Sequence, residues 1–274
     1  MTIKVTAGDA AADWVAATRE ALEAELGEQA AGAVLACVLP VIPAGYDELN
    51  WPNSACIDLP IVERLGSAAA GTVATAITHF AAASENEWRF RVYHAGSAVP
   101  IADLLPLLDN LGFRAIDERA FQFKLGSDVW LHDVGVQVPE SINLDEVSRA
   151  EVQRAFVAEF TGTVEVDGLN RLVLLAGLSA REVEILRAYS RYLRQIGFPF
   201  SQQYIEATLA RHPMIASGLV RLFIARFAPV ADATGDEVAS TAARTVIAEL
   251  LDAVPTLDDD RTLRALLALI EATV

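Results

Sequence analysis

The sequence predicts an α+β domain, built on a four-stranded antiparallel sheet with helices on one face, followed by an all-α helical domain. Three observations support this prediction. Between residues 72 and 138, several segments are rich in β-branched and aromatic residues, which is typical of strands. Helix formers dominate the residues before them, and only helical periodicity follows residue 139. A chain of 274 residues is long enough for two domains, which we place at residues 1–138 and 139–274.

The N-terminal part of the first domain is expected to be helical. Residues 11–26 are rich in helix formers and precede Gly27, a residue that favours a helix end. A second, apolar helix is expected to follow. A short helix is then predicted at residues 58–65, with Asp58 as its N-cap and Pro60 in its first turn.

The sheet is expected to follow these helices. Its predicted elements are strands at 72–80 and 88–94, a helix at 101–112 that ends at glycine, and strands at 113–124 and 129–138. The second strand alternates Trp88, Phe90 and Val92 with Arg89, Arg91 and Tyr93, which predicts one buried face and one face in water. The order helix, strand, strand, helix, strand, strand matches a ferredoxin-like or ACT-type unit whose first strand has moved to the end.

The second domain shows clear helix boundaries. Ser179 and Glu182 have the spacing of a capping box, Gly197 is expected to end that helix in a left-handed conformation, and Ser201 is the expected N-cap of the next. The apolar residues of the first helix recur with a helical period and are predicted to form one buried stripe: Ile185, Leu186, Tyr189, Tyr192, Leu193 and Ile196.

Charge is unevenly distributed along the chain. The formal net charge of −16 disfavours nucleic-acid binding, yet residues 168–230 carry eight arginines and three acids, a local formal charge of +5. Arg187, Arg191 and Arg194 are spaced to lie on one face of the predicted helix. This face is either solvated or a docking surface for an acidic partner. A DNA-reading helix is disfavoured by the overall charge.

No stretch is apolar for the ~20 residues that a membrane-spanning helix needs, and the first residues lack the pattern of a secretory signal. Two cysteines provide no disulfide framework, and we interpret Cys37 and Cys56 as buried free thiols. These features predict a cytoplasmic protein without a membrane partner.

The residues themselves indicate no chemistry. Glycine-rich dinucleotide and phosphate motifs are absent, as are C-x-x-C and H-E-x-x-H metal spacings. We interpret the four scattered histidines as structural: His79, His94, His132 and His212. The acids at 258–260 are interpreted as the first turn of a helix and not as a metal site. The two lysines, Lys4 and Lys124, suggest no reactive amine, and we predict no catalytic, cofactor-binding or metal-binding residue in this chain.

Several segments resemble the large-subunit class of bacterial NAD-specific glutamate dehydrogenases. They occur in the family's order from residue 88 onward: "LPLLDNLGFRAIDERAFQF", "VWLHDVGV", "LRAYSRYLRQIGFPFSQQYIEATLARHP" and "DDDRTLRALLALIEATV". The resemblance implies a noncatalytic stretch of a longer enzyme that oxidises L-glutamate to 2-oxoglutarate and ammonia with NAD. The family's catalytic lysine and dinucleotide fold have no counterpart here, so no catalytic or cofactor residue is transferred. The last helix has no C-cap before Val274, so we expect a longer gene product.

We therefore expect a structural and regulatory segment of such an enzyme, with other domains or subunits of the same homo-oligomer as partners. Two alternatives remain open: an ACT-type module that senses an amino-acid effector, and a scaffold for protein interactions. A free-standing enzyme has little support, because no nucleophile and base are paired by spacing.

Overall fold

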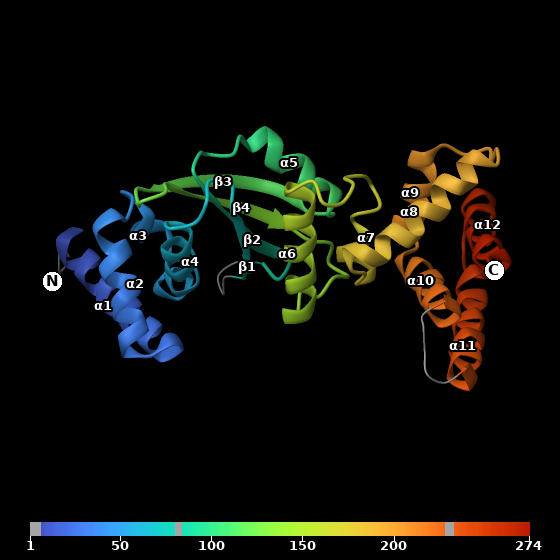
Figure 1. The fold of residues 1–274 in the computed structure, drawn as a ribbon, viewed down its shortest axis with the longest axis horizontal. Coiled ribbons are helices and arrows are strands. Elements are labelled where there is room, and N and C mark those ends of the chain that lie inside the picture. The colour runs from blue at the N-terminus through green and yellow to red at the C-terminus, as the bar shows by residue number, and fades with distance from the viewer. Residues whose placement is uncertain (1–6, 80–83, 228–232) are drawn as a thin grey trace. The chain divides into compact units, whose positions relative to one another are not determined.

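The computed structural model describes residues 7–79, 84–227 and 233–274 (Figure 1). Two residues of the sequence analysis lie outside these ranges: Lys4, one of the two lysines, and Phe80, the last residue of the first predicted strand. The chain divides into two compact units. Unit 1 comprises residues 1–104 and 115–137, and unit 2 comprises residues 105–114 and 138–274.

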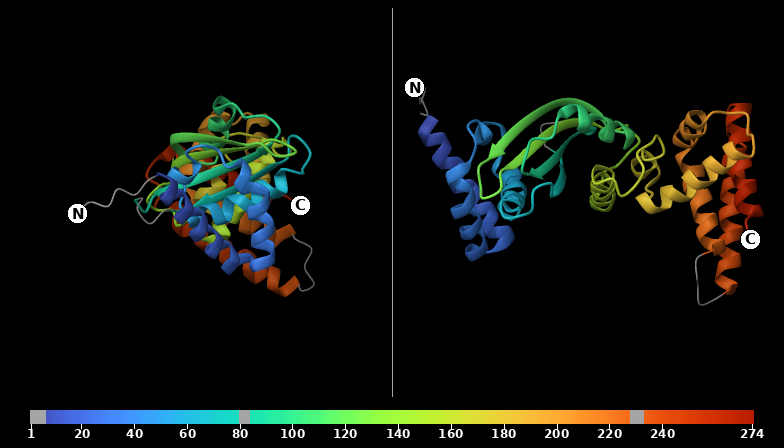
Figure 2. Two further views of the ribbon diagram at one scale, coloured as in Figure 1. Left: turned by 90° about the vertical axis from the view of Figure 1, so that its left-hand side faces the viewer. Right: turned by 45° about the horizontal axis from the view of Figure 1, so that its top comes forward.

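Unit 1 begins with helices α1 (Ala7–Leu26), α2 (Glu28–Val38), α3 (Tyr46–Leu49) and α4 (Pro52–Leu65), with the 3-10 turn η1 (Leu39–Val41) after α2. Gly27 separates the first two helices at a φ of 81°, as predicted, and both views of Figure 2 show these helices side by side. The prediction for Asp58 is wrong. Helix α4 starts at Pro52, where the fixed φ of proline suits the first turn, so Asp58 lies in the middle of the helix.

The sheet of unit 1 contains β1 (Val73–Thr78), β2 (Glu87–Ala95), β3 (Arg114–Phe123) and β4 (Val129–Gln137) in the order β1-β2-β4-β3. The predicted order of elements is confirmed, with α5 (Ile101–Asn110) between β2 and β3. Strand β2 pairs antiparallel with both neighbours, which places Arg91 opposite Ala76 of β1 and opposite Asp133 of β4.

The prediction that one face of β2 is in water is wrong. Arg91 and Tyr93 are 0% exposed and Arg89 is 9% exposed. Helix α4 packs on β1 and β2 on this side, and Tyr93 belongs to a core that includes Leu59 of α4. The alternation of side chains is therefore real, but both faces of the strand are covered.

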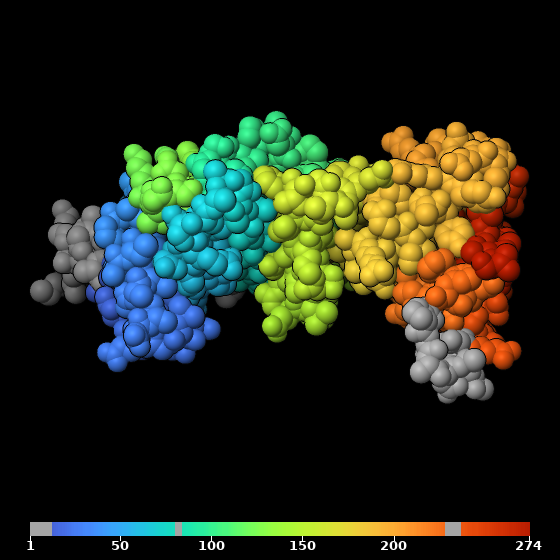
Figure 3. All heavy atoms as spheres, viewed as in Figure 1, coloured from blue at the N-terminus to red at the C-terminus, as the bar shows by residue number. Residues whose placement is uncertain are grey.

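From residue 138 onward, the regular elements of unit 2 are helices. Its helices are α6 (Glu146–Phe160), α7 (Leu172–Ala176), α8 (Ala180–Gln195), α9 (Gln202–Arg211), α10 (Pro213–Phe227), α11 (Ala233–Leu251) and α12 (Leu257–Ala272). The capping box of Ser179 and Glu182 is present, Ser201 caps α9, and Gly197 follows the C-cap of α8 at a φ of 83°. The space-filling view shows the end of α12 against α8 (Figure 3).

The predicted apolar stripe of α8 is only partly correct. Leu186 and Leu193 are buried, but Tyr192 is 50% and Ile196 is 56% exposed. The buried face of α8 is rotated from the predicted one and includes Arg187, because the neighbouring helices pack on that side. The prediction of two buried thiols is also wrong, since Cys37 is exposed.

None of the helices in the described ranges is both long and apolar enough to span a membrane.

Candidate functional site

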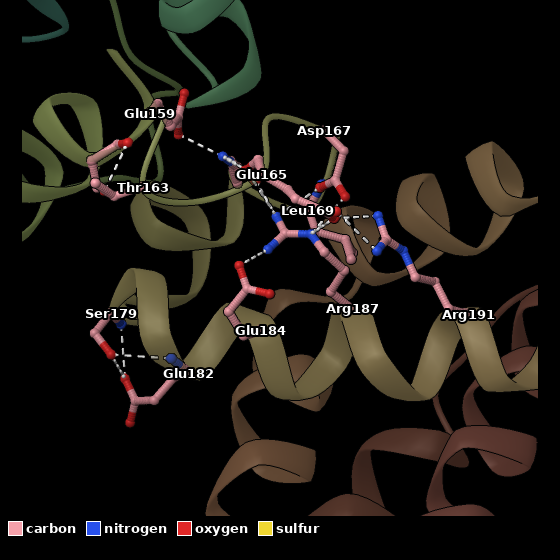
Figure 4. Close-up of polar contacts among 12 residues, drawn as sticks. Glu159, Thr163, Glu165, Asp167, Leu169, Ser179, Glu182, Glu184, Arg187 and Arg191 are labelled. Carbon is pink, nitrogen blue, oxygen red and sulfur yellow. Dashed lines mark hydrogen bonds and ion pairs between the residues drawn. The ribbon is translucent and has the colours of Figure 1, made fainter. Parts of the chain in front are cut away.

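The three arginines predicted to form a docking face lie on α8, and the structure places them in different surroundings. Figure 4 shows two of them, Arg187 and Arg191. Arg187 is enclosed, with a side chain only 3% exposed, whereas the side chain of Arg191 is 52% exposed. Arg194 is also exposed. A face on which all three are solvated is therefore not present, although a docking role for the two exposed arginines stays a prediction.

Arg187 is the centre of a polar cluster, which we call the Arg187 cluster and define as Glu159, Glu165, Asp167, Asn170, Glu184, Arg187 and Arg191. The guanidinium donates to both carboxylate oxygens of Asp167, with Nε–Oδ2 and Nη2–Oδ1 distances of 2.7 and 3.0 Å. It also donates to Glu184 one turn earlier on α8 and to the side-chain oxygen of Asn170. This bidentate arrangement with a carboxylate is among the stronger ion pairs that proteins form.

The other two arginines also bind groups of their own chain. Arg191 pairs with Glu165. Arg194 donates to the carbonyls of Phe198 and Phe200, with distances of 3.0 and 2.7 Å, and thereby binds the backbone that leaves α8. The local charge of this helix is thus partly neutralised inside unit 2, because the acids of the preceding loop meet its arginines.

Glu159 of α6 completes the cluster. Its Oε1 accepts a hydrogen bond of 2.7 Å from Asn170 Nδ2, and the residue is 4% exposed. Burial raises the pKa of this carboxyl to about 7, although the hydrogen bond from Asn170 and the charge of Arg187 act in the opposite direction. Asn170 therefore bridges a buried carboxyl on α6 and a buried guanidinium on α8.

Chemically, this arrangement is a set of ion pairs and hydrogen bonds, which we call the joint between α6 and α8. It connects α6, the loop at 161–171 and α8 through carboxylates, one amide and two guanidiniums. Within the part of the chain that the structure describes, no group of three histidine, cysteine, aspartate or glutamate side chains could hold a metal ion. These contacts hold α6, the loop at 161–171 and α8 together.

Sequence reasoning missed two further polar clusters. In unit 1, the carboxylate of Asp58 accepts two hydrogen bonds of 2.6 Å from Arg91 and also accepts from Tyr46 and Tyr93. Burial raises the pKa of both phenols, so they remain protonated donors. The available signal was the pair of arginines among the aromatic and apolar residues of β2, because charged residues are almost never fully buried without a partner.

In unit 2, Asp259 is the second missed centre. Thr256 caps α12 and the acids at 258–260 lie in its first turn, as predicted. Asp259 is in addition 3% exposed and accepts hydrogen bonds from Tyr204, Thr208 and Arg211. It therefore ties α9 to α12.

Each histidine has a polar contact within its own unit. The ring nitrogens of His79, His94 and His212 lie 3.2, 2.7 and 3.1 Å from Ser84 O, Ser97 O and Asp259 Oδ2 respectively. His132 lies 2.9 Å from Glu118 and accepts from the amide of Val99. Asp133, the next residue in β4, binds Arg89.

Comparisons with known proteins identify both parts of the chain. The family model described as "Glutamate dehydrogenase, ACT3 domain" matches residues 72–151, which contain the sheet. The model described as "Glutamate dehydrogenase, helical motif 3" matches residues 164–229, which contain most of the Arg187 cluster.

Three curated relatives carry the name NAD-specific glutamate dehydrogenase. The chain is 35% identical over 251 residues to that of Halomonas elongata and 36% identical over 254 residues to that of Pseudomonas aeruginosa, and these alignments cover 90% and 91% of this chain but only 15% and 16% of the relatives. With the protein of Mycobacterium tuberculosis it shares 38% identity over 187 residues, 65% of this chain and 12% of the relative. The chain thus spans about a sixth of the length of its relatives and belongs, as a segment with an ACT domain and a helical motif, to the NAD-specific glutamate dehydrogenase family.

Proposed function

We propose that this chain is a noncatalytic structural and regulatory segment of a cytoplasmic NAD-dependent glutamate dehydrogenase. The whole enzyme would oxidise L-glutamate with NAD to 2-oxoglutarate, ammonia and NADH. The partners of the segment would be other domains or subunits of the same homo-oligomer. The observation that carries the proposal is the succession of two domain types of one family, the ACT3 domain and helical motif 3, in a chain that spans about a sixth of its relatives.

The geometry of the polar clusters supports a structural role. The guanidinium of Arg187 is enclosed by Asp167, Glu184 and Asn170 from its own unit. Buried ion pairs add little net stability over apolar packing, but they penalise any arrangement that separates the partners. Such clusters suit a segment that must hold helices in one fixed arrangement.

The test is a calorimetric titration of the 274-residue chain with NAD, together with an assay of NADH formation from L-glutamate. Both should be flat, because the sequence contains no glycine-rich dinucleotide motif to receive the pyrophosphate. A full-length relative serves as the positive control for both assays. Micromolar NAD binding by the chain would contradict the proposal.

An amino-acid effector is the second candidate, and the sheet supplies the observation in its favour. Among the described residues, strands β1 and β3 are the edges of the sheet, and each has one side without a neighbouring strand. ACT-type units would use such an edge for an effector or for a second copy. Titration of the chain with the common amino acids separates the candidates: a rise in unfolding temperature with one amino acid supports sensing, and no response supports a purely structural segment.

A further inference from the structure

We propose that Glu159 makes the joint between α6 and α8 sensitive to pH: the joint is closed while this carboxyl carries a proton and loosens when the proton is lost. The proposal concerns one regulatory contact inside unit 2 and goes beyond the general role of the segment.

The first support is the incomplete hydrogen bonding of a buried group. Glu159 Oε1 accepts from Asn170, but Oε2 has no hydrogen-bond partner among the described residues. A cavity of about 10 Å³, room for about one water molecule, lies beside it and is lined by apolar side chains such as Val164, Val173 and Val183. A neutral carboxyl can satisfy this site through one water, whereas a carboxylate needs several donors.

The second support is the charge that surrounds the cavity. The loop between α6 and α7 contributes Glu165 and Asp167, and α8 contributes Glu184 and Arg187. Two other residues that line the cavity, Asn170 just before α7 and Val173 of α7, are neutral.

The donors of Arg187 already reach Asp167, Glu184 and Asn170. Ionised Glu159 would be a fourth carboxylate beside the two guanidiniums of Arg187 and Arg191. The buried proton is therefore favoured, and the raised pKa of about 7 places its loss near neutral pH.

The third support is the connection from this carboxyl to α8. Asn170 donates to Glu159 through Nδ2 and accepts from Arg187 through Oδ1. Once Glu159 is charged, it can be stabilised by water entering the cavity or by direct competition for Arg187. Either response brings water or Arg187 toward Glu159 and loosens the packing of α6 against α8, even though the hydrogen bond from Asn170 itself favours the charged carboxyl.

The proton can be observed directly on the full chain by carbon-13 NMR of glutamate carboxyl groups. The Glu159 resonance is assigned by its disappearance in Glu159→Gln, and Glu151→Gln on the same helix is the matched control, because the side chain of Glu151 is 30% exposed. We expect a titration midpoint near 7 for Glu159. A midpoint below about 5, close to the ordinary value for glutamate, would overturn the proposal.

The loosening is measured by hydrogen exchange of peptides from α6 and α8, in the parent chain and in Glu159→Gln at the same pH. Because intrinsic exchange cancels in this comparison, the ratio isolates the carboxyl. Glu159 has a higher pKa in the closed joint than in the open one, so the closed joint loses stability as the pH rises. From about pH 5 to pH 8, protection in the parent should therefore fall by roughly fiftyfold to a hundredfold relative to the variant. A ratio that does not change with pH shows that ionisation leaves the joint closed and overturns the proposal.

Discussion

Replacement of Arg91 by methionine should strongly destabilise unit 1. Arg91 is 0% exposed and donates two hydrogen bonds of 2.6 Å to the carboxylate of Asp58 and one of 2.9 Å to Asn50. Methionine can fill much of the same space but removes the charge. Asp58, also 0% exposed, would keep the tyrosine donors and lose its counterion.

The size of the effect follows from that unpaired charge. Removal of one partner of a buried ion pair costs about 3–5 kcal/mol, a large part of the roughly 5–15 kcal/mol that stabilise a domain. Burial raises the pKa of Asp58 above its ordinary value, and Arg91 is the main group that opposes this shift. Without Arg91 the carboxyl will take up a proton more readily, so the variant should be less destabilised in mild acid than above neutral pH.

Urea unfolding followed by tryptophan fluorescence provides the assay. All four tryptophans, Trp14, Trp51, Trp88 and Trp130, belong to unit 1, so the signal reports that unit. The control is Arg19→Met, which removes an exposed pair with Glu23 and should change the free energy of unfolding by about 0–1 kcal/mol. If both variants unfold at the same urea concentration, the buried network does not stabilise unit 1 and the reasoning is refuted.

Three further predictions concern unit 2. Gly197→Val should destabilise it by about 1 kcal/mol or more, because a β-branched residue is strained at a φ of 83°, and an unchanged melting temperature by circular dichroism would contradict this. Although burial alone would raise the pKa of Asp259, the hydrogen bonds to its carboxylate, led by the one from Arg211, hold this pKa well below the usual range. The stability that Asp259 contributes to unit 2 is thus present above about pH 4 and lost in acid. Asp259→Asn should therefore lower the melting temperature at pH 7 and make the melting temperature less dependent on pH in acid. In the full-length enzyme, Arg191 and Arg194 replaced together by Glu should weaken assembly most at low salt, as seen by sedimentation; assembly equal to the parent at low and high salt would mean that these arginines do not dock.

Local signals determined much of the fold. The capping box at Ser179, the left-handed Gly197 and the N-cap Ser201 all occur as predicted. These features could be predicted because caps and turns join residues only a few positions apart, and the backbone requirement is met by the residue itself. The order of helices and strands followed in the same way from periodicity, as the confirmed position of α5 between two pairs of strands shows.

The sequence by itself therefore determined the element types, the ends that are marked by caps and glycines, and the resemblance to a family. Only the tertiary structure decided which charges are buried, because the partners are distant in the chain: Asp58 and Arg91 are 33 residues apart, and Asp167 and Arg187 are 20 apart. Periodicity alone assigns a charged residue to water, since an unpaired charge is too costly to bury. A carboxylate supplied by another element reverses that assignment, and this is why Arg91 and Arg187 lie inside the protein while the apolar Tyr192 lies at its surface.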